Sequence, residues 1–352
     1  MPRKSSASGD AINDIARETG VSIATVSRVL NGRPDVASAT RSKVLAYIRQ
    51  RDYVSNRIAR ASAQDRTGLV GVMAPKITGG YFSEILAGVA EALDERELRP
   101  IICATRHERE REDTLIGRFA GGAADALILI LPAAPPAKLA ALYHQGYPFV
   151  VVDPTHSVED PIPVVASANR AGALRATEHL LGLGHRRIGV ITGRPGEVAT
   201  RDRLEGYTYA LTKRGIPSDP GLVRADDFEF AGGYRAAIDL LALPDRPTAI
   251  FAFNDAMAAG VIRAAREKGL TLPEDLSIVG FDDAETAAYA TPALTSVRQP
   301  LQDMGRVAVE MLDRLIAQRQ LDATRIELST RLIERSSTVR VDCGRYRWGL
   351  LI

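Results

Sequence analysis

Short apolar runs alternate with amphipathic stretches over most of the chain, from residue 69 to about residue 297. The runs LVGVMA, RPIICAT, ALILIL and PFVVVD are predicted strands, and helical patterns lie between them at about 82–96, 107–121 and 135–145. The same rhythm resumes with RIGVIT, TAIFAF and LSIVGF. Continuous Val/Ile/Leu runs separated by helices are typical of parallel strands in a sheet that helices cover on both faces. The pattern predicts an α/β core of two doubly wound parallel sheets, in which ligands bind at the carboxyl ends of the strands.

A separate helical pattern lies near the amino terminus, in residues 11–31. Apolar positions with helical spacing predict a first helix, at Ile12, Ile15 and Ala16. Gly20 is predicted to end this helix, because glycine adopts the left-handed conformation without steric cost. Ser22 then offers a side-chain oxygen that can cap a second helix.

The second helix has two different faces. Its buried face is predicted to consist of apolar side chains, namely Val26, Val29 and Leu30. Its outer face carries short residues and one arginine, namely Ile23, Ala24, Ser27, Arg28 and Asn31. A helix has to be slim to enter the major groove of DNA, and an arginine can donate two hydrogen bonds to one guanine. A plain pair of helices would share the periodicity without needing these small polar residues, so the pattern predicts an all-α helix-turn-helix that reads DNA.

Charge is distributed unevenly along the chain. Residues 1–66 contain 12 Lys and Arg against 6 Asp and Glu, a net charge of +6, whereas the remaining residues have a net charge of −4. A basic amino-terminal part on an acidic body is expected when one end of a protein meets phosphate groups. The segment VSNRIARASAQDRTG is polar, basic and rich in Ser and Ala, which predicts a linker that folds only with a partner.

Cysteine content and hydropathy exclude several classes of protein. The chain has two cysteines, Cys103 and Cys343, with the spacing of neither a zinc site nor a disulfide framework. The amino terminus, MPRKSSASGD, lacks the apolar run of a signal peptide, and no apolar stretch reaches about 18 residues. We therefore expect a soluble cytoplasmic protein that does not contact a membrane.

Sequence signatures of common enzymes are absent, among them GxGxxG, a Walker loop, GxSxG and HExxH. The five histidines show no ligand spacing, and His185, between a predicted helix and a predicted strand, is interpreted as a structural residue. Asp282 and Asp283 are adjacent, so on a strand they would point to opposite faces and form a poor acid–base pair. We expect no catalytic residue, no metal site, no cofactor and no enzymatic activity.

Polar residues gather where the predicted strands end. They are Asp153, Asn254, Asp255, Asp282 and Asp283. Arg201 and Arg203 begin a helix after RIGVIT, and Phe228 or Phe82 offers a ring on which a ligand can stack. Asp and Asn residues also cap helices on any fold. The convergence of carboxylates, an amide and an arginine at equivalent strand ends nevertheless favours a site for a polyhydroxylated ligand.

Several motifs occur together in one order along residues 11–337: GVSIATVSRVLNG, a hinge segment from Asn56, GHRRIGVITG, DRLEGY, FNDAMAAGV and LSIVGFDD. With them, the chain resembles the lactose-repressor/galactose-repressor family of bacterial transcription regulators. The resemblance implies a homodimer whose helix-turn-helix heads bind a pseudo-palindromic double-stranded DNA operator. It also implies a core similar to periplasmic sugar-binding proteins, with a cleft between two subdomains.

The resemblance further implies the boundaries of the domains. In chain order they are a disordered basic tail at 1–10, the DNA-binding head at 11–54, the hinge at 55–67, the effector-binding and dimerisation core at 68–337, and a tail of unassigned role at 338–352. Within the core, the first subdomain is expected at about 68–166 and 298–326, and the second at about 167–297 and 327–337.

On the family pattern, Ile23 and Ala24 occupy the principal base-reading positions, and Arg28 occupies a third. Further contacts with the DNA backbone or bases are expected from Ser22, Ser27, Asn31, Thr40, Asn56 and Arg57. The apolar side chains of Ile23 and Ala24 would favour thymine methyl groups over amide hydrogen bonds.

On the same pattern, six residues are expected to bind an effector: Phe82, Asp153, Arg203, Phe228, Asn254 and Asp282. The resemblance implies a repressor of carbohydrate uptake and catabolism genes. Its operator binding would change when a small sugar-type effector alters the closure of the cleft. Control by a purine-type corepressor or by a partner protein is an alternative, and a sugar-binding receptor without DNA function is a more distant one.

Three features depart from the family pattern. The hinge leucine that wedges into the minor groove is replaced by Ser62, which argues against a kinked operator. The proline that commonly precedes the hinge is replaced by Ser55. The tail VRVDCGRYRWGLLI has no leucine heptads, so a tetramerising helical bundle is not expected.

Overall fold

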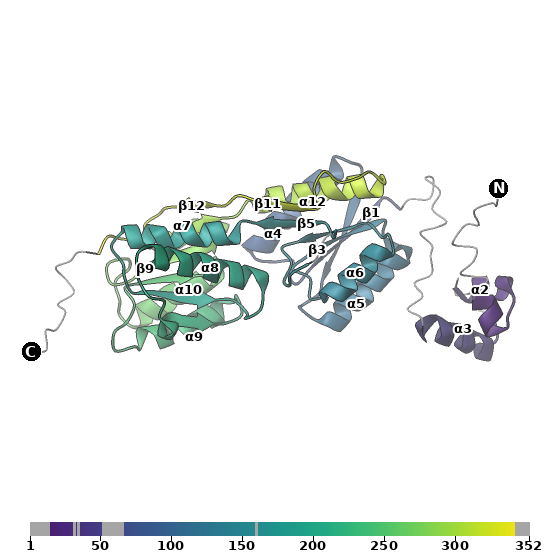
Figure 1. The fold of residues 1–352 in the computed structure, drawn as a ribbon, viewed down its shortest axis with the longest axis horizontal. Helices are drawn as coiled ribbons and strands as arrows, with labels where there is room; N and C mark the ends of the chain where they lie inside the picture. The colour runs from purple at the N-terminus through teal and green to yellow at the C-terminus, as the bar shows by residue number, and fades with distance from the viewer. Residues whose placement is uncertain (1–14, 31–32, 34–35, 51–66, 159–160, 342–352) are drawn as a thin grey trace, which may run out of the picture.

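A computed structural model of the chain describes residues 15–30, 33, 36–50, 67–158 and 161–341 (Figure 1). The hinge residues named above, Ser55, Asn56, Arg57 and Ser62, lie outside this described part. Every helix within it is too short or too polar to cross a membrane.

The amino-terminal head contains three helical segments among its described residues, at 15–19, α2 (Ile23–Leu30) and α3 (Ser38–Gln50). They form a small core of their own, made of Ile15, Ala16, Val26, Val29 and Val44. The apolar spacing found in the sequence therefore corresponds to side chains that pack between these helices.

The turn between the first two helices has the predicted glycine and serine. Gly20 has a φ of 64°, and the backbone N–H of Val21 donates to the carbonyl of Ala16 (3.1 Å), which closes the first helix. The backbone N–H of Thr25 donates to Oγ of Ser22 (3.1 Å). Ser22 thus caps α2, which confirms the prediction.

The first sheet has six parallel strands in the order β11–β5–β4–β3–β1–β2. They are β1 (Leu69–Ala74), β2 (Arg99–Ala104), β3 (Ala126–Ile130), β4 (Phe149–Val152), β5 (Val164–Ser167) and β11 (Arg325–Leu328). Helices α4 (Gly80–Asp94) and α12 (Leu301–Ile316) pack on one face. Helices α5 (Arg109–Arg118), which a π-helical turn extends (Phe119–Ala123), and α6 (Pro136–His144) pack on the other.

The second sheet has six strands in the order β12–β10–β9–β8–β6–β7, all parallel except β12, which is antiparallel to β10. The strands are β6 (Ile188–Thr192), β7 (Val223–Ala225), β8 (Ala249–Ala252), β9 (Ser277–Asp282), β10 (Thr295–Arg298) and β12 (Arg331–Ile333). The associated helices are α7 (Asn169–Gly182), α8 (Val198–Lys213), α9 (Phe230–Leu241), α10 (Asp255–Glu267) and the short α11 (Glu285–Tyr289); a 3-10 turn, Pro220–Leu222, precedes β7.

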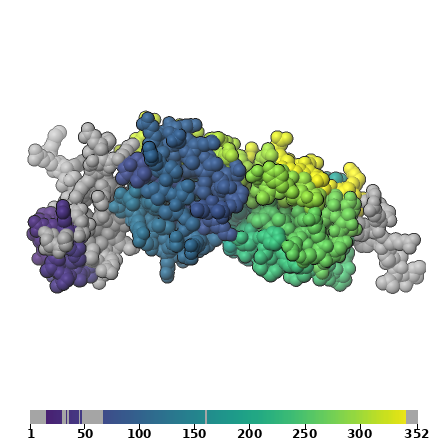
Figure 2. Space-filling view, turned by 180° about the vertical axis from the view of Figure 1, so that it is seen from behind, coloured from purple at the N-terminus to yellow at the C-terminus, as the bar shows by residue number. Residues whose placement is uncertain are grey.

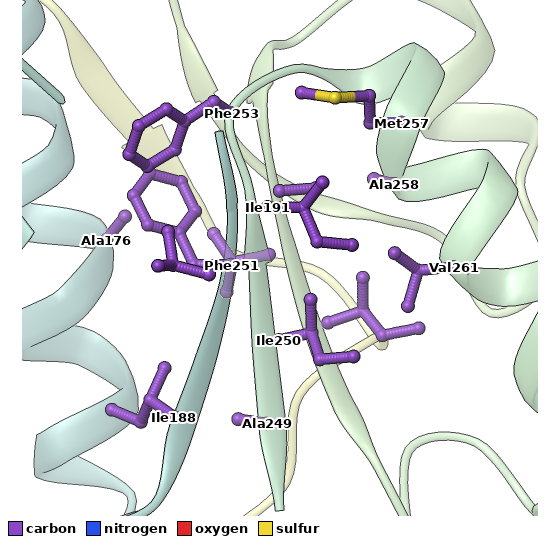
Figure 3. Close-up of a cluster of buried hydrophobic side chains, with 14 of the residues drawn as sticks. Ala176, Ile188, Ile191, Ala249, Ile250, Phe251, Phe253, Met257, Ala258 and Val261 are labelled. Atoms are coloured by element: carbon purple, nitrogen blue, oxygen red, sulfur yellow. The ribbon is translucent and has the colours of Figure 1, made fainter. Parts of the chain in front are cut away.

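Apolar side chains of the strands pack against helices on both faces of the second sheet. Phe251 and Phe253 point toward the helix that carries Ala176, whereas Ile250 points toward Val261 on α10 (Figure 3). Successive strand residues point to opposite faces, so a strand buried on both faces is a continuous apolar run. Two mainly parallel sheets covered by helices confirm the predicted α/β class.

The chain passes between the two sheets three times, after Ser167, after Arg298 and after Leu328. We call the part built on the first sheet the first subdomain, and the part built on the second sheet the second subdomain. In Figure 2 the carboxy-terminal residues, coloured yellow, run along one side of both. The three connections therefore join the subdomains side by side and leave strand ends of both sheets facing each other.

Candidate ligand pocket and nucleic-acid interface

A cavity of about 110 Å³ lies between the two subdomains, where strands of both sheets end. This volume is several times the ~10–15 Å³ that one water molecule needs. The structure brings together on its wall all six residues predicted to bind an effector, namely Phe82, Asp153, Arg203, Phe228, Asn254 and Asp282. Their contact with a ligand stays a prediction.

Arg203 is the buried cation of this wall. It lies on α8 and is 3% exposed. Its Nε donates to Oδ1 of Asn169 (2.7 Å), and its Nη1 donates to the carbonyl of Phe253. The guanidinium carbon is 3.7 Å from the centroid of the Phe281 ring. These contacts fix the plane of the guanidinium group and leave further N–H groups for a ligand.

Asp153 supplies the carboxylate of the first subdomain. It follows β4 directly and has a φ of 47°. The hydroxyl of Tyr81 donates to its Oδ2 (2.6 Å), and the backbone N–H of Ser167 donates to its Oδ1 (3.3 Å). Burial raises the pKa of Asp153, whereas these hydrogen bonds and the charge of Arg203 favour the ionised form.

Asp282 supplies the carboxylate of the second subdomain. It is the last residue of β9, and Nε2 of Gln299 donates to its Oδ1 (2.6 Å). Burial raises the pKa of Asp282 to about 7, although Arg203 and Gln299 favour ionisation. Burial lowers the pKa of Arg203, while Asp282 and Asp153 raise it. One buried cation is thus stabilised by a carboxylate from each subdomain.

Asn254 and Phe228 are held together by a shared hydrogen bond. Oδ1 of Asn254 accepts from the backbone N–H of Met257 (2.9 Å) and caps α10, while its Nδ2 donates to the carbonyl of Phe228 (2.8 Å). Phe228 has a φ of 67°, and its ring lies against Gly193. Phe82 adds a second ring to the wall.

Sequence reasoning missed several polar residues of the wall: Lys76, Tyr81, His107, Thr155, Arg194, Glu197, Asp227 and Glu229. Lys76 and Glu229 come from different subdomains and form an ion pair of 2.5 Å. Arg194 and Glu197 form another, of 3.5 Å, within the loop before α8. The sequence could have indicated Lys76, because it comes just after β1 and the predicted residues also lie at strand ends. The residues in loops have no such indication in the sequence.

The cavity wall has more carboxyl groups, which accept hydrogen bonds, than positively charged side chains. Its five carboxyl groups belong to Asp153, Glu197, Asp227, Glu229 and Asp282, and its three permanent cations to Lys76, Arg194 and Arg203. Lys76 and Arg194 are already ion-paired with Glu229 and Glu197. A ligand with several hydroxyl donors and an apolar face fits such a wall. Among the described residues, no three His, Cys, Asp or Glu side chains are grouped to hold a metal ion.

Helix α2 presents several of the predicted DNA-reading residues on its surface. Ile23 is 54% exposed, Ala24 and Arg28 are exposed, and Ser27 is half-buried. Ser22, at the start of α2, is exposed, and Thr40 on α3 is half-buried. An exposed isoleucine on a helix whose other face is buried suits a contact with a thymine methyl group. Asn31, Asn56 and Arg57, and the side chain of Leu30, lie outside the described residues.

His185 is not among the residues that line the cavity, and it is 2% exposed. Its Nε2 is 3.1 Å from the carbonyl of Val339, and its Nδ1 is 2.9 Å from Oγ1 of Thr248. Since a carbonyl only accepts, Nε2 carries the proton and donates. His185 therefore attaches the segment around Val339 to the second sheet, in agreement with its interpretation as a structural residue.

Two segments match known protein families. Residues 11–56 match the family described as bacterial regulatory proteins, lacI family. Residues 177–338 match the periplasmic binding protein-like domain.

Similar proteins cover nearly the whole chain. The ribose operon repressor of Escherichia coli (strain K12) is 33% identical over 329 residues, which is 93% of this chain and 99% of the relative. The transcriptional repressor PurR of Photorhabdus laumondii subsp. laumondii is 34% identical over 330 residues, 93% of this chain and 96% of the relative. These relatives are transcriptional repressors.

Solved structures show the same arrangement. The complex of the transcriptional regulator CelR with cellobiose has a TM-score of 0.72 and 32% identity, covering 93% of this chain and 99% of that one. The lac repressor dimer bound to operator and the anti-inducer ONPF has a TM-score of 0.70 and 29% identity, covering 93% of this chain and 98% of that one. Both the DNA-reading head and the two-subdomain core have counterparts in these proteins, and the chain belongs to the lacI family of bacterial regulatory proteins.

Proposed function

We propose that the chain is a sequence-specific repressor whose operator affinity is set by a small sugar, a mono- or oligosaccharide, bound in the cavity between the subdomains. One observation carries this proposal: carboxylates from opposite subdomains, Asp153 and Asp282, share the cavity wall with the buried Arg203. Sugar hydroxyls can donate to both carboxylates and accept from the guanidinium. Similarity to a ribose operon repressor and to a cellobiose complex supports the sugar class.

The proposed mechanism is allosteric. A ligand that contacts both subdomains favours one closure of the cleft over another. In a homodimer, the first subdomains would then shift against each other, and the two heads would no longer engage both half-sites of a pseudo-palindromic operator. Since each head alone binds weakly, loss of simultaneous binding lowers operator affinity. A coupling of ~1–3 kcal/mol corresponds to a change of about 5- to 150-fold.

The proposal assigns roles to parts of the chain. The head at 11–54 and the hinge at 55–67 bind DNA, and the core at 68–337 binds the effector and the second protomer. Base reading is assigned to Ile23, Ala24 and Arg28. We further propose that the protein acts in the cytoplasm and catalyses no reaction.

A purine corepressor is the second candidate. Phe82 and Phe228 both line the cavity, and a flat heterocycle could stack on either ring. Similarity to a PurR repressor supports this alternative. In that case ligand binding would raise operator affinity rather than lower it.

Thermal unfolding of the purified protein with D-ribose, cellobiose, other sugars and hypoxanthine tests the proposal. A ligand selective for the folded state stabilises it by about 2.7 kcal/mol at one hundred times its Kd, and so raises Tm. A sugar that raises Tm and releases operator DNA supports the proposal. A shift with hypoxanthine alone supports the purine alternative, and silence with every compound contradicts both.

A further inference from the structure

Gln299 lies in the second connection between the subdomains, between β10 and α12, and is 3% exposed. Both the oxygen and the nitrogen of its side-chain amide make hydrogen bonds. Oε1 accepts from the hydroxyl of Ser167, and Nε2 donates to Oδ1 of Asp282 (2.6 Å). Its backbone N–H also donates to the carbonyl of Asp282 (3.3 Å).

Ser167 belongs to the first connection, because it is the last residue of β5 and α7 begins two residues later. Its backbone N–H donates to Oδ1 of Asp153 (3.3 Å). Hydrogen bonds therefore run from Asp153 through Ser167 and Gln299 to Asp282. This chain of bonds crosses from the first subdomain to the second beside the cavity.

We propose that Gln299 is a positioning residue, which ties the first two connections together and thereby fixes the Asp282 carboxylate relative to Asp153. An amide can accept from a hydroxyl and donate to a carboxylate at the same time. Rotation of one subdomain against the other turns the connections, so it breaks one of these bonds and leaves a buried polar group unpaired. This inference rests on the proposed function. In that function, Gln299 couples the relative orientation of the two subdomains to the position of the Asp282 carboxylate in the effector site.

Three substitutions separate the two ends of the amide. Ser167→Ala removes the bond between the connections and keeps the bond to Asp282. Gln299→Glu keeps an acceptor for Ser167 and replaces the amide donor by a second carboxyl group against Asp282, where like charge disfavours ionisation of both groups. Gln299→Met has a similar length and removes both bonds. Ser277→Ala is the matched control, because Ser277 is a fully buried serine that contacts Val339, away from the connections.

Two measurements on the full-length protein without ligand decide the proposal. Hydrogen–deuterium exchange reports on peptides covering 164–172 and 295–303, and carbon-13 NMR of labelled aspartate reports on the titration of Asp282. Arg203, Asp153 and Asp255, the charged groups that act on Asp282, stay in place in every variant. A variant that fails to fold is recognised by fast hydrogen–deuterium exchange along the whole chain, and the remaining variants still test the role of Gln299.

We expect Ser167→Ala to raise exchange in both connections and to leave the titration of Asp282 unchanged. Gln299→Glu should move the titration upward with little change in exchange, and Gln299→Met should alter both. The double variant Ser167→Ala/Gln299→Met should show no more hydrogen–deuterium exchange than Gln299→Met alone, because the bond between residues 167 and 299 is already lost in the single variant. Unchanged exchange in Ser167→Ala, or unchanged titration in Gln299→Met, overturns the proposal. Since neither readout needs an effector, failure of every sugar to bind counts against the proposed function alone.

Discussion

The ring of Phe228 occupies the space that a Cβ atom on Gly193 would need: that position is 1.7 Å from Cε2 of the ring. Gly193 follows β6, and Phe228 precedes α9, so the close approach joins two loops of the second subdomain. The aromatic part of the cavity wall thus depends on the absence of a side chain at residue 193.

Gly193→Ala should therefore displace Phe228 and abolish the ligand-induced shift in Tm, while operator binding without ligand is retained. Gly182→Ala is the control in the same subdomain, since a Cβ at residue 182 meets nothing within 4 Å. Thermal unfolding with the active sugar measures the effect. Equal ligand shifts in the two variants would remove Phe228 from the binding site.

Arg203→Ala should abolish the effector response while leaving operator binding. The substitution removes the cation that opposes the raised pKa values of Asp153 and Asp282. It also leaves Oδ1 of Asn169 and the carbonyl of Phe253 without their donor, which costs about 1–3 kcal/mol for each buried group left unpaired. Fluorescence anisotropy of labelled operator, titrated with effector, measures the response, and thermal unfolding measures the loss of stability. Unchanged release of the operator would exclude Arg203 from the effector site.

The helices α4 and α12 cross with their backbones in contact at Gly88. A Cβ there would lie 2.0 Å from the carbonyl oxygen of Gln302. Gly88→Ala should therefore separate the helices and lower the free energy of unfolding by about 1–3 kcal/mol or more. Gly117→Ala, on α5, meets nothing within 4 Å and should raise stability by about 0.4–1 kcal/mol. Urea unfolding of both variants checks the difference, and a neutral Gly88→Ala would contradict the contact.

The contribution of His185 to the free energy of unfolding should fall as pH drops from about 6.5 to about 4, whereas Asp282, whose pKa is raised, contributes in the opposite direction. Burial lowers the pKa of His185 to about 4, so the unfolded state takes up a proton in this window and the folded state does not. The loss reaches ~3 kcal/mol at the acid end. His185→Gln should remove this contribution, so that its stability relative to the wild type rises from about pH 6.5 towards about pH 4, and His144→Gln, at an exposed position, should leave the dependence on pH unchanged. Parallel curves for wild type and His185→Gln would refute the assignment.

Arg28→Ala should weaken specific operator binding by about 1–3 kcal/mol if the guanidinium reads a base. Arg28 and Ile23 are both exposed on α2. Anisotropy titrations with operator and with random DNA, both at one fixed salt concentration, provide the comparison. An equal loss on both DNAs would assign Arg28 to a phosphate contact.

The sequence predicted the strands that are continuous apolar runs and missed the strands with few apolar residues. The continuous apolar runs of β1, β3, β4, β6, β8 and β9 are strands in the structure. The short strands β5, β7, β11 and β12 were not predicted, because each has at most three apolar residues in a row. β11 alternates between exposed and half-buried residues, and its pairing with β5 is decided by contacts far apart in the sequence.

The same reason limits prediction of the site. Asp153 lies where a strand of the first sheet ends, and Asn254 and Asp282 lie where strands of the second sheet end, so that rule alone places each of them at the carboxyl edge of its own sheet. Tyr81 lies at the start of α4 and contacts Asp153 within the first subdomain, whereas Gln299 lies in a connection and contacts Asp282. No local pattern records such contacts between residues far apart in the sequence.

The three connections between the subdomains have a consequence for synthesis of the protein. The first sheet is completed by β11, and the face under α4 is completed by α12, both of which come from residues after 300. The first subdomain therefore begins to leave the ribosome before the second subdomain, but it can complete its fold only after the second has been synthesised. A chain that stops near residue 298 carries a DNA-binding head but no complete first subdomain. Truncation late in the gene thus yields an aggregation-prone fragment rather than a smaller working regulator.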